Sequence, residues 1–207
     1  MKNSLPLVIT ISRQLGSGGA YVGQQLAKKL DVFYADREII RQAAEELLVF
    51  KEDIESRDEK ILSFWKSFLR SCAVAPDAYV PPQIIAPSDC ELFKTESEII
   101  ARIAKERSAV IIGRCGSYIL REHPNHVSIF LYGDMPFRKQ RIQKMYNVSV
   151  EIAEKMLAKN DEERARYNHT FTGKEWTDAR QYDISIDTSK IGIEKSIELI
   201  MNYLELI

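Results

Sequence analysis

Short apolar runs alternate with stretches of helical periodicity along most of this chain. The apolar runs are rich in β-branched residues and lack the polar alternation of a half-exposed strand, which is typical of buried parallel strands. We expect strands at residues 7–11, 32–35, 109–112, 127–132 and 182–187. We expect helices at residues 21–30, 37–48, 96–107, 150–166 and 193–204, and one more after Asp134, which is a suitable cap with Pro136 in the first turn. This order predicts an α/β fold with a central parallel sheet of about five strands, covered on both faces.

One long segment interrupts this alternation. Residues 49–91 hold a charged stretch, an amphipathic stretch and a loop that contains proline. We interpret them as an insertion, partly helical, over the mouth of the sheet. At 207 residues, the chain is expected to form a single domain over residues 1–207.

The composition excludes several classes of protein. The net charge of -1 argues against a general nucleic-acid binder, which is usually basic. No run approaches the roughly 18 apolar residues that a membrane span needs, and no signal peptide opens the chain. The 3 cysteines are widely spaced and odd in number, which indicates neither a disulfide framework nor a metal site. We therefore expect a cytoplasmic, soluble protein without a structural metal. Its oligomeric state stays open.

A glycine-rich turn follows the first expected strand. Between this strand and the next helix, three glycines within four residues permit positive φ angles and a close approach of the backbone to a ligand. Backbone N–H groups and the helix N-terminus form an anion-binding site in this setting. An ordinary strand-to-helix turn is the alternative. We predict that the loop binds the phosphates of a nucleotide through Gly16, Ser17, Gly18, Gly19 and Ala20.

The loop departs from the usual phosphate-binding pattern G-x-x-x-x-G-K-[ST]. Gly19 and Ala20 stand where that pattern has the lysine and the hydroxyl residue. Phosphoryl transfer depends on stabilising charge on the phosphoryl oxygens, so another cation is needed there. Arg13, at the end of the first strand, is the candidate; a surface arginine is the alternative interpretation.

Five blocks of sequence together resemble a known family. They are residues 9–19, 34–40, 110–115, 161–167 and 182–188. In this order and spacing they are similar to the cytidylate kinase-like proteins, a branch of the P-loop nucleoside monophosphate kinases. The resemblance implies a P-loop kinase-like three-layer sandwich, the use of ATP and Mg²⁺, and phosphoryl transfer to a nucleoside monophosphate, with CMP or dCMP as the first candidate.

The resemblance also implies an acceptor site. Arg114 matches the family arginine that contacts the monophosphate, although Cys115 stands where the family has an aspartate. Asp36 follows the second expected strand and Arg114 the third, so both should lie at the carboxyl edge of the sheet, where α/β folds bind ligands. Arg37 and Arg41 begin the following helix and are either further monophosphate contacts or solvated side chains. We add Asp183, which flanks the last strand, as a residue that orients an arginine.

The arginine-rich region at residues 138–170 resembles the lid of such kinases. Arg138, Arg141, Arg164 and Arg166 lie there, and we expect Arg13, Arg164 and Arg166 to be catalytic. A solvated charged face is the alternative. Trp176 either stacks on a base or packs against the last strand.

Two other functions stay open at this point. The missing lysine allows a nucleotide-binding module that no longer transfers phosphate. The poorly matched segment 49–91 allows a kinase for another small acceptor.

Overall fold

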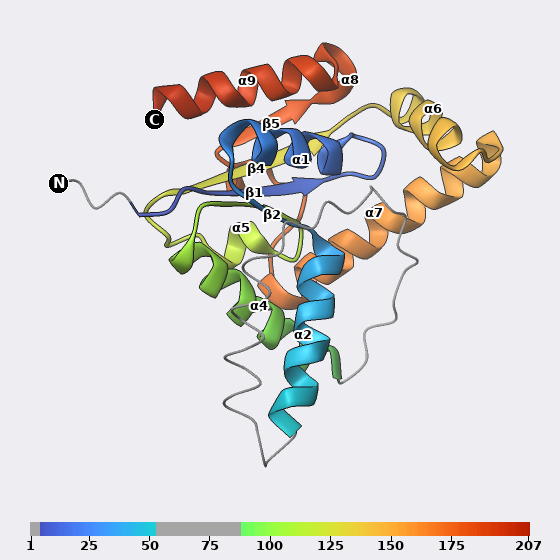
Figure 1. Cartoon of the computed structure of the whole chain (residues 1–207). Helices are drawn as coiled ribbons and strands as arrows, with labels where there is room; N and C mark the ends of the chain where they lie inside the picture. Colours follow the sequence, from blue (N-terminus) through green and yellow to red (C-terminus); the bar gives the residue numbers. More distant parts are fainter. Residues whose placement is uncertain (1–4, 53–87) are drawn as a thin grey trace.

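The computed structural model describes residues 5–52 and 88–207. The expected insertion at 49–91 falls mostly outside them, since only its first and last residues are described, within two helices. The sheet has five strands in the order β2-β3-β1-β4-β5, and every neighbouring pair is parallel (Figure 1). The strands are β1 (Val8–Arg13), β2 (Phe33–Ala35), β3 (Ala109–Ile112), β4 (His126–Tyr132) and β5 (Ile184–Asp187). The predicted parallel sheet of five strands is confirmed.

Helices connect these strands as the periodicity indicated. They are α1 (Gly19–Leu30), α2 (Arg37–Glu52), α4 (Ser88–Glu106), α5 (Gly116–Ile119), α6 (Met135–Tyr146), α7 (Val150–Thr172), α8 (Thr188–Ile191) and α9 (Ile193–Leu206). The expected cap is present, because Asp134 accepts a hydrogen bond from the Phe137 amide at 2.8 Å. The two largest differences from the predicted boundaries are that α4 begins at Ser88 rather than 96 and that α7 runs to Thr172 rather than 166. Both additional stretches are largely polar, so apolar periodicity did not reveal them.

Alternate residues of the strands pack on opposite faces of the sheet. On one face, side chains such as Val8 and Ile111 pack with α2, α4 and α5. On the other face, side chains such as Ile9 and Ile112 pack with α1 and α9. The result is three layers, with the sheet between two sets of helices (Figure 1). The two central apolar faces explain why the strand sequences are apolar without alternation.

The helices α6 and α7 form a hairpin with its own small apolar cluster. Ile142 of α6 packs there with Ala153 and Leu157 of α7, and Leu15 of the glycine-rich loop joins them. From this hairpin α7 runs back toward α4 and α5 (Figure 1). One long helix therefore connects the glycine-rich loop with the region that follows β3.

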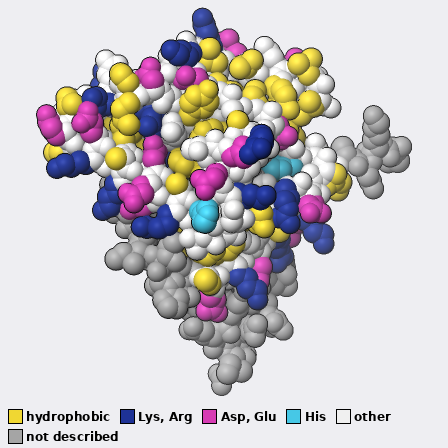
Figure 2. All heavy atoms as spheres, turned by 180° about the vertical axis from the view of Figure 1, so that it is seen from behind, with side chains coloured by type: hydrophobic (Ala, Val, Ile, Leu, Met, Phe, Trp, Pro, Cys, Tyr) yellow, Lys and Arg dark blue, Asp and Glu magenta, His cyan; other side chains and the backbone are white. Residues whose placement is uncertain are grey.

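Acidic and basic side chains are interspersed on the face shown in Figure 2, rather than gathered into one field. This distribution agrees with the net charge of -1. None of the helices in the described ranges is both long and apolar enough to cross a membrane.

Candidate functional site

The glycine-rich loop joins the carboxyl end of β1 to the first turn of α1. Gly16 and Gly18 have φ angles of 80° and 85°, and Gly18 is the N-cap of α1. Ser17 is fully buried, and its hydroxyl donates to the Gln14 carbonyl at 2.8 Å. Within the described residues, the amides of Gly16, Gly18 and Gly19 have no backbone acceptor. Free amides at the N-terminus of a 12-residue helix form a site suited to phosphate oxygens.

Arg13 occupies the space that a side chain at position 19 would need. A Cβ atom built on Gly19 would lie 2.6 Å from the Cβ of Arg13 and still closer to its Cγ. At the far end of the same side chain, Nη1 of Arg13 fills the space beside Gly113, which has a φ of 77°. Arg13 thus crosses the start of α1 and ends at the loop after β3. The positive charge beside the glycine-rich loop thus comes from Arg13 on β1 rather than from a residue of the loop itself.

The loop after β3 has an unusual backbone. Gly113, Arg114 and Cys115 have consecutive φ angles of 77°, 53° and 54°, so two side-chain-bearing residues adopt the left-handed conformation. Each such residue costs on the order of 1 kcal/mol. Burial raises the pKa of Cys115 to about 12, against the opposing effect of Arg114, so its thiol stays protonated. This strained turn forms one wall of a pocket beside the phosphate loop.

Arg114 is held by a buried carboxylate. Its Nη2 lies 2.8 Å from Oε1 of Glu96 on α4, an ion pair rather than an aligned hydrogen bond, and only 9% of Arg114 and 1% of Glu96 are exposed. Tyr167 of α7 donates its hydroxyl to Oε2 of Glu96 at 2.9 Å, and the Arg114 guanidinium lies over the Tyr167 ring. Burial raises the pKa of Tyr167, which keeps this donor protonated. Three elements thus fix Arg114 in one orientation.

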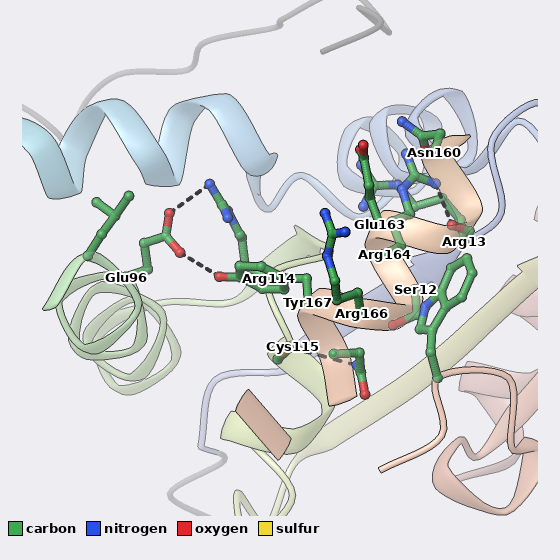
Figure 3. Close-up of a pocket in the computed structure, with 14 residues that line it drawn as sticks. Ser12, Arg13, Glu96, Arg114, Cys115, Asn160, Glu163, Arg164, Arg166 and Tyr167 are labelled. Carbon is green, nitrogen blue, oxygen red and sulfur yellow. Dashed lines mark hydrogen bonds and ion pairs between the residues drawn. The ribbon is translucent and has the colours of Figure 1, made fainter. Parts of the chain in front are cut away.

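The pocket beside the loop after β3 is shown in Figure 3; it reaches the end of β1 at Ser12 and Arg13, and residues 16–20 are not among its described lining residues. Arg164 and Arg166 of α7 both line it, together with Arg13 and Arg114. Arg164 donates to the Arg13 carbonyl, whereas Arg166 is exposed and points into the cavity (Figure 3). Arg166 has no ion-pair or hydrogen-bond partner among the described residues. The other lining residues are Ser12, Leu92, Glu96, Gly113, Cys115, Asn160, Glu163, Tyr167, Asn168 and Trp176.

Three of the expected acceptor residues lie at the start of α2, outside this lining. Asp36 caps α2 by accepting from the Ile39 amide at 3.0 Å. Arg41 pairs with Glu45 one turn away at 2.8 Å. The side chain of Arg37 falls outside the described part of the structure. A role for this trio in acceptor binding stays a prediction.

Asp183 requires a correction. It precedes β5, at the amino end of that strand, and accepts from the amide and the hydroxyl of Ser128 at 2.7 and 2.8 Å. It does not line the pocket, and no hydrogen bond joins it to an arginine in the described residues. Residues that precede a parallel strand lie away from the carboxyl edge, so the expectation that Asp183 orients a lid arginine was wrong.

Trp176 and Arg138 were open cases in the sequence. Trp176 is 6% exposed and meets Phe130 of β4 edge to face at 5.6 Å, so it packs against the fourth strand, although it also lines the pocket. Arg138 is 4% exposed and contacts the phosphate loop instead of projecting over it.

Sequence reasoning missed several residues of the pocket. Glu96, Asn160 and Asn168 are polar yet buried, and Oδ1 of Asn160 has no hydrogen-bond partner within the described structure. Each lies in a helix of mostly polar sequence, where nothing local distinguishes it from a solvated residue. What identifies these residues as part of the pocket is contact with residues distant in sequence, such as the ion pair between Glu96 and Arg114.

The described residues contain no group of three or more acidic, histidine or cysteine side chains that could hold a metal. Ala20 supplies no hydroxyl, and that of Ser17 is buried against Gln14. Kinases commonly hold Mg²⁺ through substrate phosphates, water and one or two carboxylates. Glu163 lines the pocket and precedes the catalytic candidate Arg164 in the sequence. Its carboxylate is of the kind that could be the one protein ligand of such a Mg²⁺ ion.

Comparisons with known proteins agree with this geometry. A model of the cytidylate kinase-like family matches residues 8–190. A cytidylate kinase of Saccharolobus islandicus (strain Y.G.57.14 / Yellowstone #1) is 24% identical over 124 residues, which are 59% of this chain and 65% of that protein. This chain thus covers slightly less than two thirds of that relative. A cytidylate kinase of Sulfurisphaera tokodaii is 23% identical over 202 residues, covering 96% of this chain and 97% of its own.

Solved structures share the fold. An uncharacterized protein from Eubacterium ventriosum ATCC 27560 superposes with a TM-score of 0.72 at 24% identity, over 97% of this chain and 99% of that one. A shikimate kinase from Bacteroides thetaiotaomicron gives a TM-score of 0.51 at 15% identity, over 96% and 98% of the two chains. The architecture is that of the P-loop kinases.

Proposed function

The chain belongs to the cytidylate kinase-like family, and from this premise we propose that it transfers the γ-phosphoryl group of ATP to CMP, dCMP or a similar nucleoside monophosphate. An oxygen of the acceptor phosphate forms the new bond to the γ-phosphorus, and the bond from that phosphorus to the β-phosphate oxygen breaks. No covalent intermediate with the protein is needed. The work of the protein is to position two anions and to stabilise charge.

The position of Arg13 is the observation that carries the proposal. Its side chain lies on Gly19, at the lysine position of the usual loop, and its guanidinium lies beside Gly113 at the acceptor wall. A cation at this place lies between the donor loop and the acceptor pocket, where the transferred group must pass. Full positive charge there opposes the charge that develops on the phosphoryl oxygens.

The other residues divide between donor and acceptor. The amides of Gly16, Gly18, Gly19 and Ala20 hold the donor phosphates, with Ser17 buried beneath them. Arg114 and Arg166 contribute charge to the acceptor phosphate, and Arg164 fixes the end of β1 through the Arg13 carbonyl. Mg²⁺ supplies charge neutralisation at the donor oxygens when it is bound.

The first experiment is a phosphoryl-transfer screen of the full chain against all nucleoside monophosphates, with ATP hydrolysis alone as the background. We expect transfer to a pyrimidine monophosphate well above that background. ATP binding without transfer to any acceptor would favour a nucleotide-binding module, which the missing lysine allows. Transfer only to another small molecule would replace the nucleotide acceptor.

Arg13→Ala tests whether the Arg13 guanidinium takes the place of the missing lysine. We expect single-turnover transfer to fall at least about a hundredfold, since one well-placed arginine is worth roughly 10³–10⁵ in rate in related reactions. The melting temperature should change little. Arg180→Ala is the matched control, because Arg180 is 90% exposed and pairs only with Asp178.

The double substitution Arg13→Gly with Gly19→Lys rebuilds the usual lysine-bearing loop. Gly19→Lys alone meets the Arg13 side chain and should disturb α1, whereas the double variant has room for the lysine. We expect the double variant to transfer phosphate at least about tenfold faster than Arg13→Ala. This gain is a small part of the roughly 10³–10⁵ in rate that one well-placed arginine supplies in related reactions. An Arg13→Ala variant as active as wild type would show that Arg13 is not the cation.

A further inference from the structure

Leu15 makes the most extensive contact between the glycine-rich loop and the α6–α7 hairpin. Only 9% of Leu15 is exposed, and its side chain packs into the cluster of Ile142, Ala153 and Leu157. These three residues belong to α6 and α7. The tip of the loop therefore depends on helices that follow it by more than a hundred residues.

Both backbone polar groups of Leu15 are bonded to this hairpin. The Leu15 amide donates to Oδ1 of Asp161 on α7 at 3.1 Å, and its carbonyl accepts from Nη1 of Arg138 on α6 at 3.2 Å. The same Nη1 of Arg138 donates to Oδ2 of Asp161, which closes a ring of three residues. Arg138 is 4% exposed and the side chain of Asp161 19%, so the ring is shielded from water on the side of Arg138 and partly accessible at Asp161.

The next residue of the loop confirms how close α6 approaches. A Cβ atom on Gly16 would lie 2.9 Å from the carbonyl oxygen of Arg138 and 3.1 Å from its Cα. Gln14, on the other side of Leu15, accepts from the Gly133 amide at 3.3 Å. Three successive residues of the loop thus contact the segment around the start of α6.

Charge adds a reason for pairing these two side chains. A lone carboxylate beside an anion-binding loop would repel phosphate. Arg138 neutralises Asp161, so that Asp161 can accept the Leu15 amide without opposing the ligand. One turn further along α7, Arg164 reaches the Arg13 carbonyl and Arg166 points into the pocket. The helix that holds the loop also carries acceptor-side residues.

We propose that Arg138 and Asp161 are positioning residues, which hold the phosphate loop in the geometry that binds the donor through the backbone of Leu15. The proposal rests on the proposed function only in naming ATP as the donor. Neither side chain touches the substrate. Both residues lie in the region that resembles a lid, and through Leu15 they support the site that binds the donor.

The test compares two variants of the α6–α7 hairpin by calorimetric titration with ATP and with the acceptor found in the transfer screen. Asp161→Ala removes the acceptor of the Leu15 amide. Glu154→Ala is the matched control, because Glu154 pairs with Lys139 across the same two helices without touching the loop. Asp161→Asn keeps an oxygen for the amide and loses the charge.

We expect Asp161→Ala to weaken ATP binding about tenfold, as for the loss of one ordinary hydrogen bond and of the order it imposes. Acceptor affinity should stay within about threefold, and Asp161→Asn should regain at least half of the lost ATP affinity on a logarithmic scale. Glu154→Ala should bind ATP like wild type.

Equal ATP affinity in Asp161→Ala and Glu154→Ala would overturn the proposal. So would an equal loss of ATP and acceptor affinity, since that indicates damage to the whole structure. If Asp161→Ala does not fold, Arg138→Met takes its place, because it removes the donor to the Leu15 carbonyl, and ATP binding by Arg138→Met within twofold of Glu154→Ala overturns the proposal as well. Transfer to no acceptor at all, with ATP binding intact, would overturn the proposed function and leave the ATP comparison decisive for the loop.

Discussion

At the amino half of the sheet the polar side chains bond in pairs, Thr10 with His126 and Ser128 with Asp183, whereas at the carboxyl edge the polar side chains face a pocket. The hydroxyl of Thr10 lies 2.7 Å from Nε2 of His126, and Asp183 exchanges hydrogen bonds with Ser128 in both directions. At the other edge, Arg166 points into open space, and Oδ1 of Asn160 has no partner in the described structure.

The backbone conformation also differs between the amino and carboxyl edges of the sheet. Among the described residues, three consecutive left-handed residues, Gly113 to Cys115, follow β3 at the carboxyl edge, whereas a single one, Asp31, precedes β2 at the amino edge. Strain persists where surrounding contacts fix it, and here those contacts include the Arg114–Glu96 pair. The comparison teaches that a polar cluster is a stronger candidate for a ligand site when some of its members, here Arg166 and Oδ1 of Asn160, have no partner among the described residues.

The largest expected effect comes from breaking the pair that supports the carboxyl edge. Glu96→Ala leaves the charge of Arg114 buried without its partner, and we expect unfolding free energy to fall by about 3–5 kcal/mol. Urea denaturation measures this. Glu106→Ala is the matched control on α4, because its pair with Arg102 is about 38% exposed and is worth at most about 1 kcal/mol. Similar losses in both variants would show that the Glu96 pair is not special.

A smaller effect is expected from acid at the amino half of the sheet. Burial lowers the pKa of His126 from 6.5 to about 4, only partly opposed by the nearby Asp183 charge, while His123 lowers it further. As the pH falls, His126 is therefore protonated near pH 6.5 in the unfolded chain but only near pH 4 in the folded chain. Stability is lost as the pH falls through this window, by roughly 2–3 kcal/mol for this residue.

Denaturation at pH 7 and pH 4.5 of wild type and His126→Gln isolates this contribution. We expect the loss on acidification to be smaller in His126→Gln, whereas the same change at His169, an exposed histidine of α7, leaves it as in wild type. An unchanged acid loss in His126→Gln would contradict the assignment.

The smallest expected effect is at Asp183. Asp183→Asn weakens the two bonds to Ser128, and we expect a loss of about 1–2 kcal/mol of stability, because this side chain is partly exposed. The KM for the acceptor should stay within about twofold of wild type, since Asp183 does not line the pocket. A rise in that KM with unchanged stability would return Asp183 to the acceptor site.

Local sequence patterns predicted much of this molecule. The five strands and the phosphate loop follow from short apolar runs and three glycines, and Arg13 follows from its place beside that loop. These features depend on residues close in sequence. The family resemblance pointed to Arg114 and to the region of Arg164 and Arg166, all of which line the pocket.

What could not be predicted depends on contacts between distant residues. Glu96 and Arg114 are 18 positions apart and lie on different elements, and Asp161 meets Leu15 across 146 positions. The sequence of α7 looks like a solvated charged helix, because nothing local to Asp161 distinguishes an aspartate that contacts the loop from one that is exposed to solvent. Asp183 was misplaced for a related reason: flanking a strand does not tell which end of the strand a residue occupies.

The contact of Arg13 with Gly19 and Gly113 constrains how such a loop can change over generations. A lineage that acquires a lysine at position 19 while keeping Arg13 meets a steric conflict, and one that first loses Arg13 passes through a stage with no cation at the loop. On the proposed function, both single-step routes pass through a less active protein, so the two versions of the loop are separated from each other. Gly113 deepens the separation, because any side chain there meets the same guanidinium. Ancestral reconstruction should therefore find these three positions changing together or not at all.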